Sequence, residues 1–365
     1  MKKERKANIE LLRLISMIMI VGLHFFLNCS IDKINIINEN FIFTWIMEAI
    51  FYNSVNCFII ITGYFGVKLK LNKNRILSIC LITIFYSYLF LFLFILLNRN
   101  LNAKNILISI FPIISGQYWF VTVYILLSLI SPILNLIINT IPRNNFKKGL
   151  FVSILIFSII PTFYPLADYN INLKGGTNLI WFIILYFTGA YIRKYKIDFE
   201  KRKKLFIIFA CMFVVIFTKI SFCFILNRTV GGAIFYHHNS IFIYISSVTI
   251  FLLFKNLNIK NDFIKKCILL GASVSFGVYI IHENIFIKNF IWEKILDIQN
   301  LNSKYWPIFA ILTILIIFIF CSILEYFRQI IFRKHFIQVK LENLIFNNKL
   351  FEKINKLLKN KNLIN

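Results

Sequence analysis

The sequence predicts an all-α, polytopic membrane protein with about ten transmembrane helices and both termini in the cytoplasm. Of its 365 residues, 59% are hydrophobic and 15% are charged, and the mean hydropathy is +0.76. A soluble domain of this length would carry about 25% charged residues. The apolar segments, and the basic residues between them, predict how many helices cross the membrane and in which direction.

Ten segments are long and apolar enough for transmembrane helices, which need about 20 residues each. Pro161 and Pro165 interrupt the fifth segment, and the apolar stretch 106–114 is short enough to predict an interfacial or re-entrant piece. No small-residue cleavage site follows the first segment, so we expect it to be retained as a span. The ten segments are 8–28, 43–66, 76–97, 118–139, 149–166, 177–195, 204–226, 239–257, 266–287 and 306–330.

Basic residues predict the orientation of these helices. They concentrate in the N-terminal tail and in every second loop, while the loops between are nearly neutral. The positive-inside rule therefore places the basic loops and both termini in the cytoplasm of a cell-membrane protein. The basic groups are Lys2, Lys3, Arg5 and Lys6; Lys68, Lys70, Lys73 and Arg75; Arg143, Lys147 and Lys148; Arg193, Lys194, Lys196 and Lys201 to Lys204; and Lys255, Lys260, Lys265 and Lys266.

The chain changes character near its C-terminal end. We expect residues 1–332 to form the membrane domain and residues 333–365 to form a basic cytoplasmic tail. Apolar residues recur in that tail at helical spacing, which is typical of an amphipathic helix on the anionic inner leaflet. A solvated tail without regular structure is the alternative.

Composition also excludes some functions. The formal net charge is +26, but no basic motif is interleaved with aromatic residues and no nucleic-acid-binding motif is present. Nucleic acid is therefore not an expected partner, whereas membrane lipid is. Most of the seven cysteines lie within apolar segments without metal-ligand spacing, so we interpret them as small core residues.

Ionisable residues make the first span unusual. It carries Glu10, Arg13 and His24, although a charge at the bilayer centre costs about 2.5–3.5 kcal/mol. Arg13 and His24 are eleven residues apart, so they share one helix face about 16 Å apart along the axis. Taken singly, Arg13 could snorkel to the interface and His24 could be a hydrogen-bonded interior residue. Together on one face with Glu10, they favour a functional site, with Arg13 in the cytoplasmic third and His24 in the outer third.

His282 lies in the ninth span at a depth similar to that of His24. Two histidines at matched depth could meet across a cavity, and histidine suits general acid–base chemistry. The alternative is that His282 and Glu283 only end the helix at the outer interface.

Three further residues are weaker candidates. His237 and His238 are adjacent in an outer loop, and without a third ligand nearby they do not predict a metal site. Lys219 lies deep in the seventh span, where it is either a charge site or a lysine whose long stem snorkels. Because the adjacent histidines have no third ligand nearby, we expect no bound metal.

Motifs in the first two spans resemble those of the membrane acyltransferase type 3 family. Arg13 and His24 reproduce its R-x10-H signature, and NIELLRLISMIMIVGLHF looks like its opening helix throughout. In the second span, CFIIITGYF resembles the family's FFxxSGF-like segment, with Thr62 in place of the usual serine. These motifs occur in the order and at the spacing that the family has.

Later segments extend the resemblance to most of residues 5–330. YWFVTVYILLSLISPIL, which includes Trp119, resembles the family's WF-x-x-x-Y helix start. SFGVYIIH resembles its late Tyr-Leu-x-His segment and places Tyr279 and His282 at those positions. The family's R-x-x-R pattern at the third span is incomplete here, because Arg75 is followed by Ser78.

The resemblance implies transfer of an acyl group, usually acetyl, from cytoplasmic acyl-CoA to a hydroxyl of a bacterial surface polysaccharide or its lipid-linked precursor. The donor would be a substrate, and no bound cofactor is expected. The resemblance assigns catalytic roles to His24, Arg13 and His282. It assigns substrate contacts to Glu10, Arg75, Trp119 and Tyr279.

Physical chemistry suggests how such residues would work. Arg13 and Arg75 could hold the CoA phosphates, and His24 could act as general base or relay the acyl group. One alternative is a transporter or flippase of lipid-linked saccharides, which would not need a histidine base paired at the R-x10-H spacing. Another is a catalytically silent family member, which the serine at position 78 favours.

Overall fold

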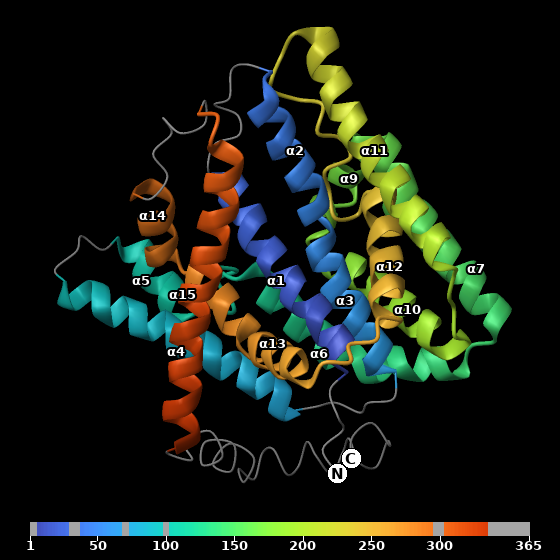
Figure 1. Ribbon diagram of the computed structural model, residues 1–365. Helices are drawn as coiled ribbons and strands as arrows, with labels where there is room; N and C mark the ends of the chain where they lie inside the picture. The colour runs from blue at the N-terminus through green and yellow to red at the C-terminus, as the bar shows by residue number, and fades with distance from the viewer. Residues whose placement is uncertain (1–5, 29–36, 68–72, 98–101, 295–302, 335–365) are drawn as a thin grey trace.

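The computed structural model describes residues 6–28, 37–67, 73–97, 102–294 and 303–334, and within these ranges it is all-helical (Figure 1). The elements are α1 (Ala7–Asn28), α2 (Glu39–Phe51), α3 (Asn53–Gly66), α4 (Lys73–Leu96), α5 (Ala103–Ile110), α6 (Trp119–Thr140), α7 (Arg143–Ile154), the π-helix η2 (Leu155–Ile159), α8 (Ile160–Phe163), α9 (Pro165–Asn170), the 3₁₀ turn η3 (Lys174–Gly176), α10 (Leu179–Tyr195), α11 (Lys201–Leu226), α12 (Ile241–Lys255), α13 (Asp262–His282), α14 (Ile285–Lys294) and α15 (Trp306–Lys334).

Each predicted span contains helix, but not every helix is of spanning length. Among the described residues, eight helical segments are long and apolar enough to cross a membrane. The predicted spans 177–195 and 239–257 correspond instead to α10 and α12, with 17 and 15 residues. At 1.5 Å per residue these helices are about 26 and 23 Å long, less than the ~30 Å hydrocarbon core.

Two predicted spans are interrupted helices. The second consists of α2 and α3, which meet at Tyr52, and the fifth consists of α7, η2 and α8. The π-helix η2 ends directly before Ile160, so the wider turn lies next to Pro161, which lacks a backbone N–H. The predicted short piece 106–114 corresponds to α5, whose Ser109 carbonyl accepts a 2.9 Å hydrogen bond from Ser87 of α4.

Helix α1 lies within the bundle and packs against α2, α3, α12, α13 and α15. Figure 1 shows α1 beginning and α15 ending at the same end of the molecule. The placement of both termini in the cytoplasm stays a prediction from loop charge. Residues 335–365 of the predicted tail lie outside the described residues, and residues 333–334 continue α15.

Helices α3 and α10 cross at very short range. A Cβ atom at Gly189 would lie 2.2 Å from the Ile60 carbonyl oxygen, and one at Gly63 would lie 2.1 Å from the Tyr186 carbonyl oxygen. Small residues of this kind let helix backbones approach closely in membranes. The crossing holds the short helix α10 firmly in the bundle.

The connection from α11 to α12 turns back beside α11 before α12 starts (Figure 1). Lys219 holds its first part: Nζ donates to the carbonyls of Thr229 at 3.0 Å and Gly231 at 2.5 Å, and it lies 4.0 Å from the centroid of the Trp45 ring. Lys219 is only 1% exposed. Lys219 therefore anchors this connection and does not extend to the interface. His238, at the end of the same connection, is also buried.

Candidate functional site

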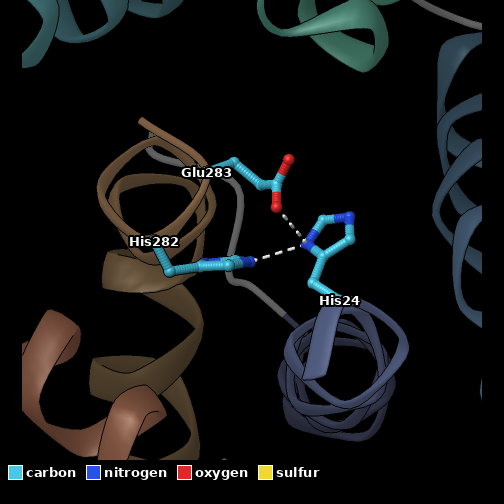
Figure 2. A group of neighbouring side chains, drawn as sticks. All are labelled: His24, His282 and Glu283. Carbon is cyan, nitrogen blue, oxygen red and sulfur yellow. Dashed lines mark hydrogen bonds and ion pairs between the residues drawn. The ribbon is translucent and has the colours of Figure 1, made fainter. Parts of the chain in front are cut away.

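His24 and His282 meet where α1 and α13 end (Figure 2). His24 Nδ1 lies 2.8 Å from His282 Nε2 and 3.2 Å from Glu283 Oε1. His282 is fully buried, so it does not simply end its helix at the interface. The structure thus brings together the two histidines that the sequence placed at matched depth.

Hydrogen-bond partners determine which nitrogen of each ring carries the proton in the neutral pair. His282 Nδ1 lies 2.6 Å from the Val278 carbonyl oxygen, which can only accept, so His282 Nδ1 is the protonated nitrogen. His282 Nε2 then accepts, and His24 Nδ1 must donate to it. His24 Nε2 is left with a free lone pair, and Figure 2 shows it on the side of the ring away from both partners.

Glu283 is the residue of this cluster that sequence reasoning left without a role. Its Oε1 makes no hydrogen bond among the described residues, because the His24 N–H is directed at His282, so its 3.2 Å contact with His24 is electrostatic. Glu283 Oε2 forms an ion pair with Lys288 at 3.2 Å. A carboxylate at this distance stabilises a positive charge that develops on His24. Its position directly after His282 was the available signal.

A local break in the chain presents these side chains. The predicted span 266–287 is wrong at its end, because α13 stops at His282 and α14 starts at Ile285. The Asn284 side chain accepts from the Phe286 N–H at 3.1 Å, as in a helix N-cap, and donates to the Tyr118 hydroxyl at 3.0 Å. The Tyr118 hydroxyl in turn donates to the Ile280 carbonyl at 3.1 Å. These bonds tie the end of α13 to the start of α6.

A cavity of about 230 Å³ lies beside His24, which lines it together with Trp119, Tyr279 and His238. We call it the histidine cavity. The ring centroids of His24 and Tyr279 are 6.2 Å apart, and those of Trp119 and His238 are 6.3 Å apart. Two predicted substrate contacts, Trp119 and Tyr279, therefore lie at the same cavity as His24.

His238 adds a second imidazole to this cavity from the α11–α12 connection. Its Nδ1 donates to the Tyr52 carbonyl at 3.1 Å. Burial lowers the pKa of His238 to about 4, against which the bond to Tyr52 acts only in part. His238 is therefore neutral near pH 7.

The other predicted residues lie away from the histidine cavity. Arg13 Nη1 pairs with Glu10 Oε1 at 2.6 Å, about three turns of α1 before His24. The guanidinium of Arg75, near the start of α4, lies 5.4 Å from the centroid of the Tyr124 ring. The structure therefore places these basic residues apart from His24.

His24, His282 and Glu283 are also the group of described residues that offers metal-ligand atoms, all within 4.8 Å of one another. Two nitrogens bound to one zinc ion at about 2.0–2.1 Å in tetrahedral geometry would lie about 3.3 Å apart. The 2.8 Å separation of the histidine nitrogens is that of a direct hydrogen bond. A metal could enter only if this bond separated, and the expectation of no metal stays a prediction.

A family model described as an acyltransferase domain matches residues 6–325. The matched region includes α1, the histidine cluster and the cavity beside it. Comparison with curated proteins and with solved structures found no match.

Proposed function

Because the chain belongs to the membrane acyltransferase type 3 family, we propose that it moves an acyl group, usually acetyl, from cytoplasmic acyl-CoA to a hydroxyl of a cell-surface polysaccharide or its lipid-linked precursor. The observation that carries this proposal is the His24–His282 hydrogen bond, which leaves His24 Nε2 unprotonated at a cavity. A neutral imidazole with a free nitrogen is the group that general-base catalysis requires.

In this reaction His24 Nε2 takes the proton from the acceptor hydroxyl. The hydroxyl oxygen forms a bond to the thioester carbonyl carbon, the carbon–sulfur bond breaks, and the CoA thiolate leaves and receives the proton. Glu283, 3.2 Å from His24 Nδ1, stabilises the imidazolium while His24 is charged. His282 keeps His24 in the required tautomer.

The same nitrogen also supports a second route, nucleophilic catalysis. His24 Nε2 can attack the thioester itself, releasing CoA and forming an acyl-imidazole that the acceptor hydroxyl then cleaves. Both routes need the Nδ1-protonated tautomer, and both end in an ester and free CoA.

Donor binding falls to the other end of α1. Arg13, with Glu10 beside it, and Arg75 lie near the helix ends that loop charge places at the cytoplasm. Guanidinium groups bind phosphate through charge and bidentate hydrogen bonds. We propose that these two arginines hold the anionic part of acyl-CoA.

The experiment is to replace His24 with Gln and to measure acyl esters released by mild alkali from the surface glycan. Esters should be lost while the glycan and the membrane level of the protein stay normal. Ser153→Ala is the matched control, because the half-buried Ser153 donates its hydroxyl to the Gly149 carbonyl within the same helix, α7, at 2.8 Å. Unchanged ester content in His24→Gln would refute the catalytic role. Loss of the glycan itself would favour the transporter function.

A further inference from the structure

A second cavity of about 230 Å³ lies between the α8–α9 segment and the connection from α11 to α12. We call it the loop cavity, and Asp168, Tyr169, Asn239 and Ser240 are among the residues that line it. Drug-sized ligands occupy pockets of about 300–1,000 Å³, so this volume suits a smaller group such as one sugar ring.

The loop cavity and the histidine cavity are neighbours. Lys174 and His237 line both, so the two cavities adjoin at these two residues. A ligand with a group against His24 would therefore present its next unit to the loop cavity. This adjacency is the first observation that points to an extended ligand.

The wall between the two cavities is held by several hydrogen bonds. Asp168 accepts from the Gly175 N–H at 3.0 Å and from the Asn239 side chain at 2.7 Å, and the His238 N–H donates to the Gly175 carbonyl at 2.9 Å. Gly175 has a φ of 63°, and a Cβ there would lie 2.7 Å from His237 Nδ1, so glycine is favoured at this point. The wall is thus a built feature of the fold.

One buried oxygen at the loop cavity lacks a partner. Ser240 is only 2% exposed, yet its Oγ makes no hydrogen bond among the described residues. Ser240 is the N-cap residue of α12, and its carbonyl accepts from the Tyr244 N–H at 2.8 Å, but its side chain makes no cap hydrogen bond. A buried hydroxyl of this kind costs about 1–3 kcal/mol when it is left unsatisfied. Because Ser240 lines the cavity, rotation of its side chain toward a ligand hydroxyl would remove this cost.

The other lining groups also suit a sugar. Each oxygen of Asp168 keeps a lone pair after its bonds within the protein, and carboxylates accept from hydroxyls. Tyr169 is 83% exposed, and its ring offers an apolar face. The Asp168 carboxylate offsets the charge of Lys174, so the cavity has no excess positive charge to select an anionic ligand. Asp168, Asn239 and Ser240 offer hydrogen-bond partners that sugar hydroxyls can use.

We propose that the loop cavity binds the sugar unit next to the one that is acylated, so that the acceptor is a saccharide of at least two units. This inference rests on the proposed function. It adds that recognition of the acceptor extends beyond the reacting sugar, through the shared border at Lys174 and His237.

The test uses the full-length protein in detergent and fragments of the host's own surface glycan, stripped of esters with mild alkali and separated into one-unit and two-unit saccharides. We expect the two-unit fragment to bind about tenfold more tightly, by titration calorimetry, than the one-unit fragment. Ser240→Ala removes an oxygen that has no partner within the described residues, so it should leave folding intact and abolish most of this preference. Tyr169→Ala should also leave folding intact, because Tyr169 is exposed, and should abolish most of the preference, because its ring lines the cavity.

Ser153→Ala is again the control and should keep the full preference. Affinity for the one-unit fragment should stay the same in all variants, because that unit lies at the histidine cavity. Equal affinity for the two fragments, or an unchanged preference in both variants, would overturn the inference. Neither result bears on the proposed function, which fails by a different outcome, namely unchanged esters in His24→Gln.

Discussion

Replacing His282 with Ala tests whether the histidine pair sets the tautomer of His24. The substitution removes the acceptor that lies 2.8 Å from His24 Nδ1 and leaves only the more distant Glu283 Oε1, at 3.2 Å, to hold the proton on this nitrogen. A hydrogen bond to a group that becomes charged contributes about 1.5–3 kcal/mol. At 1.36 kcal/mol per factor of ten, we expect kcat to fall about 10- to 150-fold.

The assay is the release of free CoA thiol by purified protein in lipid nanodiscs, with acetyl-CoA and de-esterified host glycan as substrates. His282→Gln is the matched variant, because its side-chain oxygen can still accept the proton of His24 Nδ1. We expect it to recover most of the rate, while both variants show similar thermal stability. A rate in His282→Ala equal to that of the natural protein, or no difference between the Ala and Gln variants, would refute the tautomer argument.

Two further predictions concern stability, measured as the midpoint of thermal unfolding in detergent. Gly189→Ala should destabilise by about 1–3 kcal/mol, because its Cβ would lie 2.2 Å from the Ile60 carbonyl oxygen, whereas Gly149→Ala meets open space and should not. Equal midpoints would contradict the close crossing of α3 and α10. Because the pKa of His238 is lowered to about 4, the unfolded chain takes up a proton first as the pH falls below 6.5. Its contribution, about 3 kcal/mol, should be present above pH 6.5 and lost towards pH 4, and His238→Asn should remove this part of the pH dependence.

Hydropathy predicted the helices well where a helix is a single apolar segment. The first predicted span, 8–28, matches α1 (Ala7–Asn28) closely. Hydropathy failed at the end of α13. The break there depends on the side chain of Asn284, which bonds to the Phe286 N–H and to the Tyr118 hydroxyl. Polar contacts of this kind leave no pattern in the hydropathy of the sequence.

Helix geometry made part of the site predictable. Depth in the bilayer follows from position along a helix, so the meeting of His24 and His282 could be predicted from two sequence positions. The loop cavity could not, because it joins segments about 70 residues apart through Asp168 and Asn239. The α11–α12 connection turns back beside α11, and this turn also depends on tertiary contacts, namely the hydrogen bonds of Lys219 to two carbonyls.

The separation along α1 constrains the donor as much as the acceptor. Arg13 and His24 lie about 16 Å apart along one helix axis, and only His24 of the two lines the histidine cavity. If Arg13 holds phosphate, the reactive carbonyl of the donor must lie at the end of a long flexible arm to reach His24 Nε2. Acyl-CoA has such an arm between its phosphates and its thioester, and a small acyl phosphate does not. The geometry of α1 therefore favours acyl-CoA, and it allows the acyl group to cross about half of the ~30 Å hydrocarbon core while the donor's charge stays at the end where α1 begins.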